Sequence, residues 1–189
     1  MSRINQLALA VGALCLSSVA SAQVAEFTAF GGASRLSGKD LGSGYSLDDG
    51  WRLGGRITLN SGMFFGHEFG YAYNRTKLFL NGVDIGGMAI HQGFYDFLVY
   101  VIPEGGRVRP FIAGGGQFSN FVPPGSSATQ GGGENKFGVN YGGGLKFRLG
   151  PKYLMRLDFR QYNSGKPFSL GGSGRLRQNE ISIGFGIGL

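Results

Sequence analysis

The sequence predicts an all-β fold, an eight-stranded antiparallel up-and-down transmembrane β-barrel. Eight segments alternate apolar residues with small or polar ones, which is the period-two pattern of β-strands. The connections between these segments alternate between short and long. The last segment, residues 178–189, finishes on its apolar face. That ending is expected of a strand that closes a barrel in a membrane, and not of a soluble protein.

The N-terminus predicts export. Arg3 supplies a short positive region, residues 7–19 form an apolar run, and residues 20–22 fit the small-residue cleavage rule. The run is too short for a membrane helix, which needs about 20 residues. We therefore expect residues 1–22 to be a cleaved signal peptide and residues 23–189 to form one barrel domain. Cleavage would remove Cys15, the single cysteine.

The composition favours strands over helices. The chain holds 37 glycines, 13% aromatic residues and only 15% charged residues, and glycine and aromatic residues are poor helix formers. The net charge of +7 would by itself suggest nucleic acid. We expect no nucleic-acid partner, because the chain has no basic run and carries an export signal.

The first four predicted strands each place their apolar residues on one face. They cover residues 24–36, 50–60, 63–74 and 88–102. Their apolar faces carry Ala25, Phe27 and Ala29 in the first strand, Trp51, Leu53, Ile57 and Leu59 in the second, Phe65, Phe69, Tyr71 and Tyr73 in the third, and Tyr95, Phe97, Val99 and Val101 in the fourth. Residues 60–62, Asn-Ser-Gly, predict a tight turn between the second strand and the third.

The last four predicted strands cover residues 109–121, 136–149, 153–162 and 178–189. The first of these is the least regular. The others alternate clearly, with Phe137, Val139, Tyr141, Leu145 and Phe147, then Met155, Leu157 and Phe159, then Ile181, Ile183, Phe185, Ile187 and Leu189 on their apolar faces. Turn residues such as Gly150-Pro151 bound these segments.

The lengths of the connections favour a membrane barrel. Residues 60–62, 103–108 and 150–152 are short connections, whereas residues 37–49, 75–87, 122–135 and 163–176 are long and rich in Gly, Ser and Asn. Short periplasmic turns and longer external loops are typical of outer-membrane barrels. A tilted strand of about 13 residues rises roughly 30 Å, which is enough to span a membrane.

The charges decide which face points outward. A soluble lipocalin-like barrel has the same strand count but places its apolar face inside. Here the polar face carries five acids and six bases, and such a balance is expected where charges are buried and must be paired. We predict a lumen charge network of Glu26, Arg52, Arg56, Glu68, Asp96, Lys146, Arg148, Arg156, Asp158, Arg160 and Glu180.

Aromatic residues on the apolar face predict two membrane-interface belts. One belt would lie near the long connections and the other near the short turns. The members are Trp51, Tyr73 and Phe137 in the first, and Phe65, Phe111, Phe147 and Tyr153 in the second.

At this point the chain resembles the eight-stranded outer-membrane barrels of the opacity-protein and OmpA transmembrane-domain type. Residues 107–116 look like the family's Arg-Pro-aromatic, glycine-rich fifth strand, and Ser182, Gly184, Ile187 and Leu189 match its C-terminal assembly signal. The family usually ends in an aromatic residue, and Leu189 departs from that pattern. The resemblance implies an outer-membrane location, contact with outer-membrane lipid and lipopolysaccharide, and assembly by the barrel-assembly machinery with periplasmic chaperones.

Two functions follow for such a barrel. The first is a structural or surface-interaction role through the four long external loops, in a protein that we expect to be a monomer without cofactor or metal. Seven loop cations are candidates for lipid phosphates: Lys39, Arg75, Lys77, Lys136, Lys166, Arg175 and Arg177. The external ligand itself is not identified by the sequence.

The alternative is a narrow porin-like channel. Six inward glycines, Gly138, Gly142, Gly144, Gly184, Gly186 and Gly188, leave little side chain on two strands. Large arginines on other strands either fill that space or leave a thin water path. Leu78, Phe79 and Leu80 in the second long connection suit either a groove for an apolar solute or a longer hairpin.

The sequence argues against an enzyme. The two histidines, His67 and His91, both lie on the lipid-facing phase, and the side chains of His67 and Glu68 point to opposite faces. A nucleophile and base within hydrogen-bond reach are therefore not expected. A β-bulge in the third strand is one way to turn His67 inward.

Overall fold

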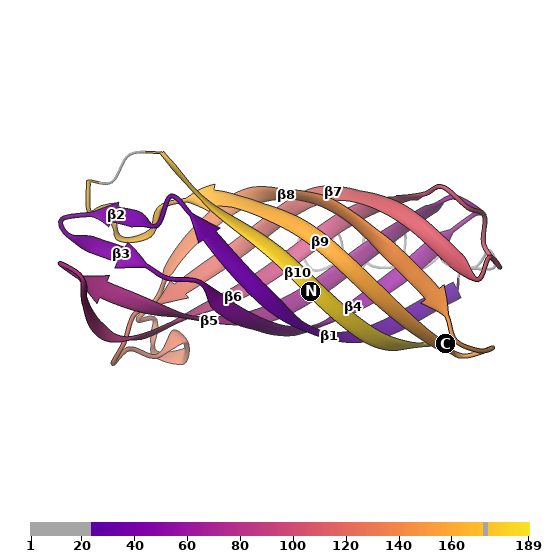
Figure 1. Cartoon of the computed structure of the whole chain (residues 1–189), viewed down its shortest axis with the longest axis horizontal. Coiled ribbons are helices and arrows are strands. Elements are labelled where there is room, and N and C mark those ends of the chain that lie inside the picture. Colours follow the sequence, from indigo (N-terminus) through magenta and orange to yellow (C-terminus); the bar gives the residue numbers. More distant parts are fainter. Residues whose placement is uncertain (1–23, 172–173) are drawn as a thin grey trace, which may run out of the picture.

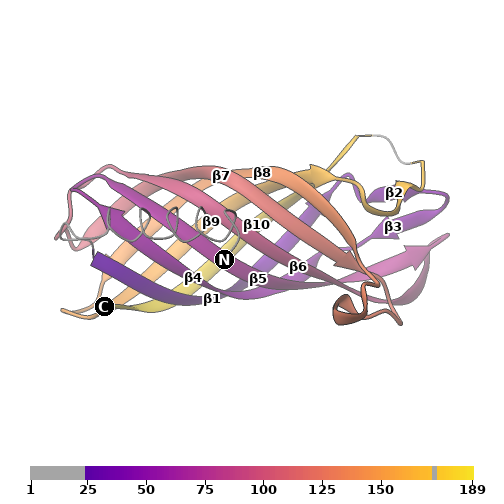
Figure 2. The same cartoon turned by 180° about the vertical axis from the view of Figure 1, so that it is seen from behind.

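The computed structural model describes residues 24–171 and 174–189 (Figures 1 and 2). The predicted signal peptide lies outside these residues, so its cleavage and the predicted start of the barrel domain at residue 23 stay predictions. Among the described residues, no helix is long and apolar enough to cross a membrane.

Eight long strands form a closed antiparallel barrel. Their bounds are β1 Val24–Ser37, β4 Gly50–Ser61, β5 Phe65–Leu80, β6 Val83–Tyr100, β7 Val108–Val122, β8 Glu134–Arg148, β9 Tyr153–Gly165 and β10 Arg175–Gly188. Each pairs with the next along the chain, and β1 pairs with β10 to close the wall. The predicted eight-stranded up-and-down barrel is therefore confirmed. Short turns lie at one end and the longer connections at the other (Figure 1).

Side chains along each strand of the wall alternate between exposed and buried positions. On β10, Ile181 and Phe185 are 66% and 57% exposed, whereas Glu180 between β1 and β9 is fully buried. The apolar face thus points outward and the polar face points into the lumen along this strand, which is the reverse of a soluble barrel. The arrangement excludes the lipocalin-like alternative.

Two of the predicted long loops are largely strand. The predicted loop at residues 75–87 is wrong, because β5 and β6 pair up to Leu80 and Val83 and turn at Asn81-Gly82. Both turn residues have positive φ, 49° and 81°, which Asn and Gly tolerate best. In the predicted loop at residues 37–49, β2 (Asp40–Gly42) and β3 (Tyr45–Leu47) form a small hairpin, and β3 adds onto β5.

The other two long connections contain single 3-10 turns. The turn η1 (Ala128–Gln130) lies between β7 and β8, and η2 (Pro167–Ser169) lies between β9 and β10. The residues that flank η2 bond the β2–β3 hairpin: Lys166 Nζ donates to the Asp40 carbonyl, and Ser43 Oγ donates to the Leu170 carbonyl at 2.9 Å. The first and fourth connections therefore fold onto each other.

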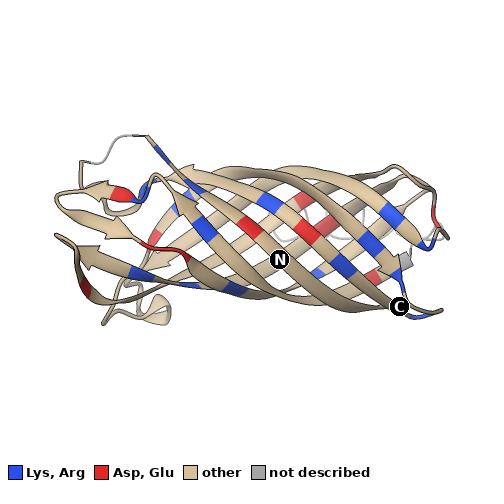
Figure 3. Cartoon of the chain, viewed as in Figure 1, with Lys and Arg blue, Asp and Glu red and all other residues tan. Residues whose placement is uncertain are grey.

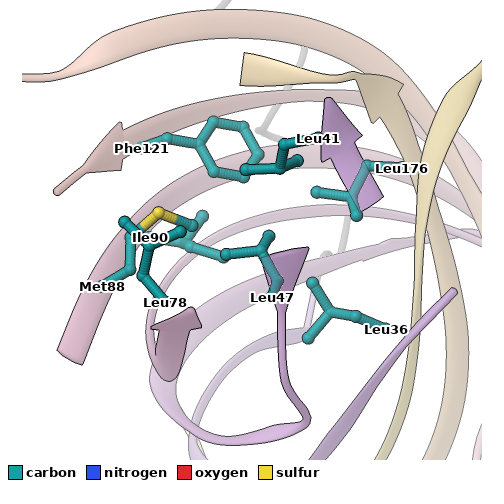
Figure 4. Packing of buried hydrophobic residues seen from close by; sticks show 8 residues of the cluster. All are labelled: Leu36, Leu41, Leu47, Leu78, Met88, Ile90, Phe121 and Leu176. Atoms are coloured by element: carbon teal, nitrogen blue, oxygen red, sulfur yellow. The ribbon is translucent and has the colours of Figure 1, made fainter. Parts of the chain in front are cut away.

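A small apolar core, which we call the external cap, closes this end of the barrel. Its buried residues come from five barrel strands and from both strands of the small hairpin, and Figure 4 shows their side chains pointing toward one another. They are Leu36, Leu41, Leu47, Leu78, Met88, Ile90, Phe121 and Leu176, with Tyr45, Phe168 and Leu170 packed against them. Leu78 therefore belongs to a longer hairpin that buries it in the cap.

Two further expectations concern the histidines and Phe111. The β5 register is continuous around His67, the third residue of its strand, so no bulge turns this side chain inward. It stays outward and its Nδ1 lies 2.8 Å from the Tyr95 hydroxyl, while His91 Nδ1 lies 2.6 Å from the Tyr71 hydroxyl. Phe111, placed in an outer belt by the sequence, is buried inside the lumen.

Candidate functional site

Six charged side chains form a layer across the middle of the lumen, which we call the central charged layer: Arg56, Glu68, Asp96, Arg156, Asp158 and Arg160. Figure 3 shows red and blue segments crossing the mid-barrel strands. Three carboxylates face three guanidiniums, so the layer is neutral. Glu68, Asp96, Arg156 and Arg160 are all fully buried, and none is more than 1% exposed.

Glu68 accepts the most contacts within the layer. Its carboxylate bonds Arg156, lies 2.8 Å from Arg160 Nη2 and 3.5 Å from Arg56 Nη1, and accepts the Thr58 hydroxyl at 2.9 Å. Because arginine presents several donors in a fixed fork, one guanidinium can bridge two carboxylates. Arg160 does so here, since it also bonds Asp96.

The strands bring these groups together by register. Glu68 on β5 lies directly opposite Asp96 on β6, and like charges in that position destabilise a sheet. The bridging guanidinium of Arg160 relieves this repulsion from across the lumen. Residues 156, 158 and 160 are alternate residues of β9, so all three point inward, and Asp158 lies 2.9 Å from Arg156 Nη2 and 3.0 Å from Arg56 Nη1.

A second group lies toward the short turns. Lys146 Nζ lies 2.6 Å from Glu26 and donates to the Tyr100 hydroxyl at 2.8 Å. Asn60 completes the group, because its amide donates to Glu26 at 3.1 Å and its carbonyl accepts from Tyr100 at 2.8 Å. A buried ammonium is tolerable with these partners.

A third group lies toward the external cap. Arg52 Nε lies 2.8 Å from Glu180, and Arg52 also donates to Gln92. The chain of amides continues from Gln92 to Gln117 and to Ser119 Oγ at 3.0 Å.

Aromatic rings fill the space between the charged groups. The Arg52 guanidinium lies 4.3 Å from the Tyr162 ring centroid, Arg56 lies 3.9 Å from that of Phe30, and Arg156 lies 4.3 Å from that of Phe111. Cations over ring faces are attracted by the ring quadrupole. The rings in turn lie against glycines: a Cβ on Gly54 would meet Phe30 at 2.6 Å, and one on Gly70 would overlap Phe94.

The six glycines of the channel alternative are covered in similar ways. A Cβ on five of them would approach neighbouring atoms: Gln117 Nε2 at 3.0 Å from Gly138, Arg160 Cα at 2.8 Å from Gly142, Phe111 at 2.8 Å from Gly144, Thr28 Cγ2 at 2.7 Å from Gly184, and Thr28 Oγ1 at 2.6 Å from Gly186. Gly188, at the end of β10, is more open, with the Lys152 carbonyl at 3.9 Å. Five of these glycines therefore allow close packing.

Ten of the eleven residues predicted for the lumen lie buried inside it. The exception is Arg148, whose side chain is 40% exposed at the short-turn end and lies 2.7 Å from Glu104. The sequence prediction missed Arg109, which is buried, bonds Glu104 and stacks 3.8 Å from the Tyr100 ring centroid. The sequence does hold a signal for Arg109: Gln117 and Ser119 alternate with Phe118, and Arg109 has the same inward phase as Gln117 and Ser119.

The residues of the predicted assembly signal divide between the two faces. Ser182 is buried and Gly184 faces Thr28 inside the lumen, whereas Ile187 and Leu189 are exposed on the outer face. Their recognition by assembly machinery stays a prediction.

At the external end, the seven predicted loop cations differ in whether their side chains have bonding partners. Lys39 lies 2.8 Å from Asp49, Lys77 lies 2.9 Å from Asp84, and Lys136 lies 2.7 Å from Glu134. Lys166 donates to a carbonyl, and Arg75 donates to the Tyr73 hydroxyl at 3.3 Å. The hydrogen bond from Lys39 holds the pKa of Asp49 below its ordinary value, and the same bond raises the pKa of Lys39.

Three arginines at this end lack such a hydrogen-bonded partner among the described residues, although the Asp49 carboxylate, which Lys39 already bonds, interacts electrostatically with Arg35. Arg35 on β1 and Arg175 and Arg177 on β10 are exposed, and within residues 24–171 and 174–189 none of them makes an ion pair or a side-chain hydrogen bond. The register pairs Ser37 with Arg177 and Arg35 with Asn179, so Arg177 lies between the other two on the outer face, diagonal to Arg35 and two residues from Arg175. We call the three arginines the arginine triad.

The part of the chain that the structure describes holds no group of three or more His, Cys, Asp or Glu residues able to bind a metal ion. His67 and His91 bond tyrosine hydroxyls on the outer face, on the side of the wall opposite to the carboxylates of the lumen.

Comparisons with known proteins agree on the fold. A family model described as "Outer membrane protein beta-barrel domain" matches residues 7–187. No curated protein matches the chain in sequence.

Three solved structures illustrate the similarity. The outer membrane protein OprG of Pseudomonas aeruginosa aligns with a TM-score of 0.61 at 14% identity, over 88% of this chain and 95% of that one. The N-terminal β-barrel domain of Pseudomonas aeruginosa OprF gives 0.58 at 14% identity, over 88% and 97%. Ail, the attachment invasion locus protein of Yersinia pestis, gives 0.52 at 16% identity, over 88% and 98%.

Proposed function

The chain belongs to the family of outer membrane protein β-barrel domains, and from that premise we propose that it is a surface-interaction protein whose external end binds phosphate groups of lipopolysaccharide. The observation that carries the proposal is the arginine triad. Like charges this close in sequence and register repel one another, and an anion bound beside them relieves the repulsion. Arginine matches phosphate with two parallel hydrogen bonds, so the triad fits phosphorylated glycolipid.

The position of the triad supports a ligand in the outer leaflet. Arg177 precedes Asn179 by two residues and Ile181 by four, on the external side of both. Ile181 is 66% exposed and faces lipid. The triad therefore lies just outside the apolar band, at the level where lipid phosphates meet water. The other external cations differ, because Lys39, Lys77 and Lys136 already have carboxylate partners.

The filled lumen favours this role over the channel alternative. A water-filled path would expose the side chains that line it, yet Glu68, Asp96, Arg156 and Arg160 are fully buried. Eight strands enclose an interior that side chains can fill. The external cap lies above this layer and closes the same end of the barrel with apolar side chains.

The remaining partners are proposed on the resemblance and on family membership. The C-terminal residues Ser182, Gly184, Ile187 and Leu189 would be read by the barrel-assembly machinery, with periplasmic chaperones carrying the unfolded chain. We propose a monomer, because the eight-stranded barrel is closed by its own β1 and β10 and needs no second chain to complete the wall.

The test is binding of lipopolysaccharide to the refolded protein in phosphatidylcholine nanodiscs, measured by calorimetry. The triple variant Arg35→Gln, Arg175→Gln, Arg177→Gln removes the unpaired charges. We expect it to bind at least about tenfold more weakly, because it loses several charge-assisted hydrogen bonds worth about 1.5–3 kcal/mol each. We also expect the parent protein to bind dephosphorylated lipopolysaccharide more weakly than the phosphorylated form. High salt should weaken its binding of the phosphorylated form.

The matched control is Lys39→Gln, Lys77→Gln, Lys136→Gln, which removes the same number of positive charges from the same end. This control should bind within about twofold of the parent, because exposed ion pairs contribute little. Equal losses in the two triple variants would indicate a diffuse charge effect. Unchanged binding by the arginine variant would contradict the proposal.

A further inference from the structure

A groove of about 530 Å³ lies at the short-turn end of the barrel, opposite to the arginine triad. Two arginines, Arg107 and Arg148, lie along it together with the apolar side chains of Val108, Phe147, Leu149 and Pro151. Short turns face the periplasm in outer-membrane barrels, so the groove lies at the level of the inner leaflet of the outer membrane.

The backbone fixes the two arginines beside each other. The Arg148 amide donates to the Arg107 carbonyl at 2.8 Å, which joins the turn before β7 to the end of β8. Arg148 reaches Glu104 at 2.7 Å, while Arg107 is exposed and, in the part of the chain that is described, forms no ion pair.

The charge at this end is strongly positive. Glu104 is shared by Arg109 and Arg148, and Arg107 and Lys152 add two exposed charges without a carboxylate partner among the described residues. Glu26 at the same end is balanced by Lys146, so among these side chains the cations exceed the carboxylates by three. No acidic side chain lines the groove itself.

Three other grooves on the surface lack this net positive charge: the one at the external end is lined by Arg75 and Lys77 but also by Asp48, Asp49 and Asp84. One of about 370 Å³ is lined by Tyr95, Phe118 and Phe137 among others, and one of about 270 Å³ is lined by Phe27, Tyr153 and Phe185 among others. Neither has a charged lining residue. Such grooves fit acyl chains of any lipid, whereas the basic groove also selects a headgroup.

We propose that the basic groove binds one anionic phospholipid of the inner leaflet. The phosphate is held by the guanidiniums of Arg107 and Arg148, and the glycerol and first acyl carbons lie against Val108, Phe147 and Leu149. An anionic headgroup fits better than a zwitterionic one, because the single nearby carboxylate, Glu104, is already shared by two arginines. The apolar lining favours a lipid over a soluble phosphate.

The test is native mass spectrometry of the refolded protein released from vesicles of equal parts phosphatidylglycerol and phosphatidylcholine. We expect one retained phosphatidylglycerol per protein. Arg107→Gln should reduce its enrichment over phosphatidylcholine about tenfold, since it removes one guanidinium from the phosphate. It leaves the pair between Arg148 and Glu104 intact. Glu104→Gln should keep or increase the enrichment, because Arg148 and Arg109 then have no competing carboxylate.

The control is the triple variant of the arginine triad at the opposite end, which should retain phosphatidylglycerol like the parent. Equal retention of both lipids by the parent would overturn the proposal, as would unchanged enrichment in Arg107→Gln. Displacement of the lipid by equimolar glycerol phosphate would assign the groove to a free phosphate and also overturn it. A dimer that is retained without lipid and lost in Arg107→Gln would assign the groove to a second copy of the chain.

Discussion

The central charged layer and the external cap lie inside the same eight-stranded wall, yet their chemistry is opposite. On β5, Glu68 of the central charged layer points inward and Phe69 outward, whereas Leu78 points inward and Lys77 outward near the cap. On β10, Glu180 and Ile181 give way in the same manner to Leu176 and Arg177.

The same alternate residues of each strand point inward in both regions. What differs between the regions is the medium outside the wall. Where lipid surrounds the wall, apolar side chains point outward and the interior must satisfy its own polar groups. Where water surrounds the wall, burial of apolar side chains again stabilises the interior. The exchange between the two patterns therefore marks the membrane boundary on each strand, and Arg35, Arg75 and Arg177 lie near it.

The largest difference between the regions should appear on removal of a charge from the central layer. Arg156→Ala leaves Glu68 and Asp158 with one fewer buried partner, and breaking a buried ion pair costs about 3–5 kcal/mol. Urea unfolding of the protein in lipid vesicles measures this loss of unfolding free energy. Arg175→Ala, which removes an exposed arginine, should change it by less than about 0.5 kcal/mol. Equal stabilities of parent and Arg156→Ala would exclude a tightly coupled layer.

A substitution in the external cap should destabilise the cap without destabilising the wall. Leu41→Ala removes a fully buried side chain from β2, and such truncations cost about 2–5 kcal/mol. We expect this cost to fall on the cap alone, because the small hairpin pairs only with the external end of β5 and is not one of the strands that close the wall. Hydrogen exchange should speed up in residues 36–49 while the amides of β7 to β9 stay protected. Faster exchange throughout the wall would show that the two regions unfold as one.

Disturbing a contact between a glycine and an aromatic ring should cost an intermediate amount of unfolding free energy. A methyl group at Gly70 would overlap the Phe94 ring, and overpacking of this kind costs about 1–3 kcal/mol. Phe94→Leu alone should also destabilise, but the double variant Gly70→Ala, Phe94→Leu should recover part of the loss. A double-mutant cycle on urea unfolding measures this coupling, and purely additive losses would argue that the ring does not occupy the glycine site.

The smallest effect is expected at the exposed pair of Lys39 with Asp49. Lys39→Ala should reduce cap stability by less than about 1 kcal/mol, because exposed ion pairs are screened by solvent. The pKa of Asp49 lies below its ordinary value of 3.8, so the pair stabilises the cap above that value and the contribution is lost as pH falls through the lowered pKa. Hydrogen exchange of parent and variant should differ at neutral pH and converge in acid. A difference that persists in acid would assign the effect of Lys39 to packing.

The sequence predicted the wall and most of the lumen residues because strand alternation is a local signal. It placed Glu68 and Arg156 on one face correctly, although they are 88 residues apart in the chain. It did not give their pairing, because the contacts depend on which strands face each other across the lumen. It missed Arg109 and misplaced Phe111, since the glycine-rich stretch after them conceals the alternation of β7.

The external end was less predictable for a different reason. Residues 75–87 carry turn-forming Asn and Gly, and these suggested a loop, but β5 and β6 continue because Leu78, Met88 and Ile90 gain burial in the cap. Tertiary burial outweighed local turn propensity there. Arg148 lies at the mouth of the lumen and not deep inside it, because strand phase gives the face of a residue but not its depth.

Ion conductance of the refolded protein in planar bilayers tests the filled lumen most directly, with a heat-modifiability gel to show that the barrel is folded. Because Glu68, Asp96, Arg156 and Arg160 of the central layer are fully buried, we expect a folded protein that stays silent while a porin added to the same bilayer conducts. Steady openings from the folded protein, present at every insertion, would contradict a packed interior and restore the narrow channel as its function.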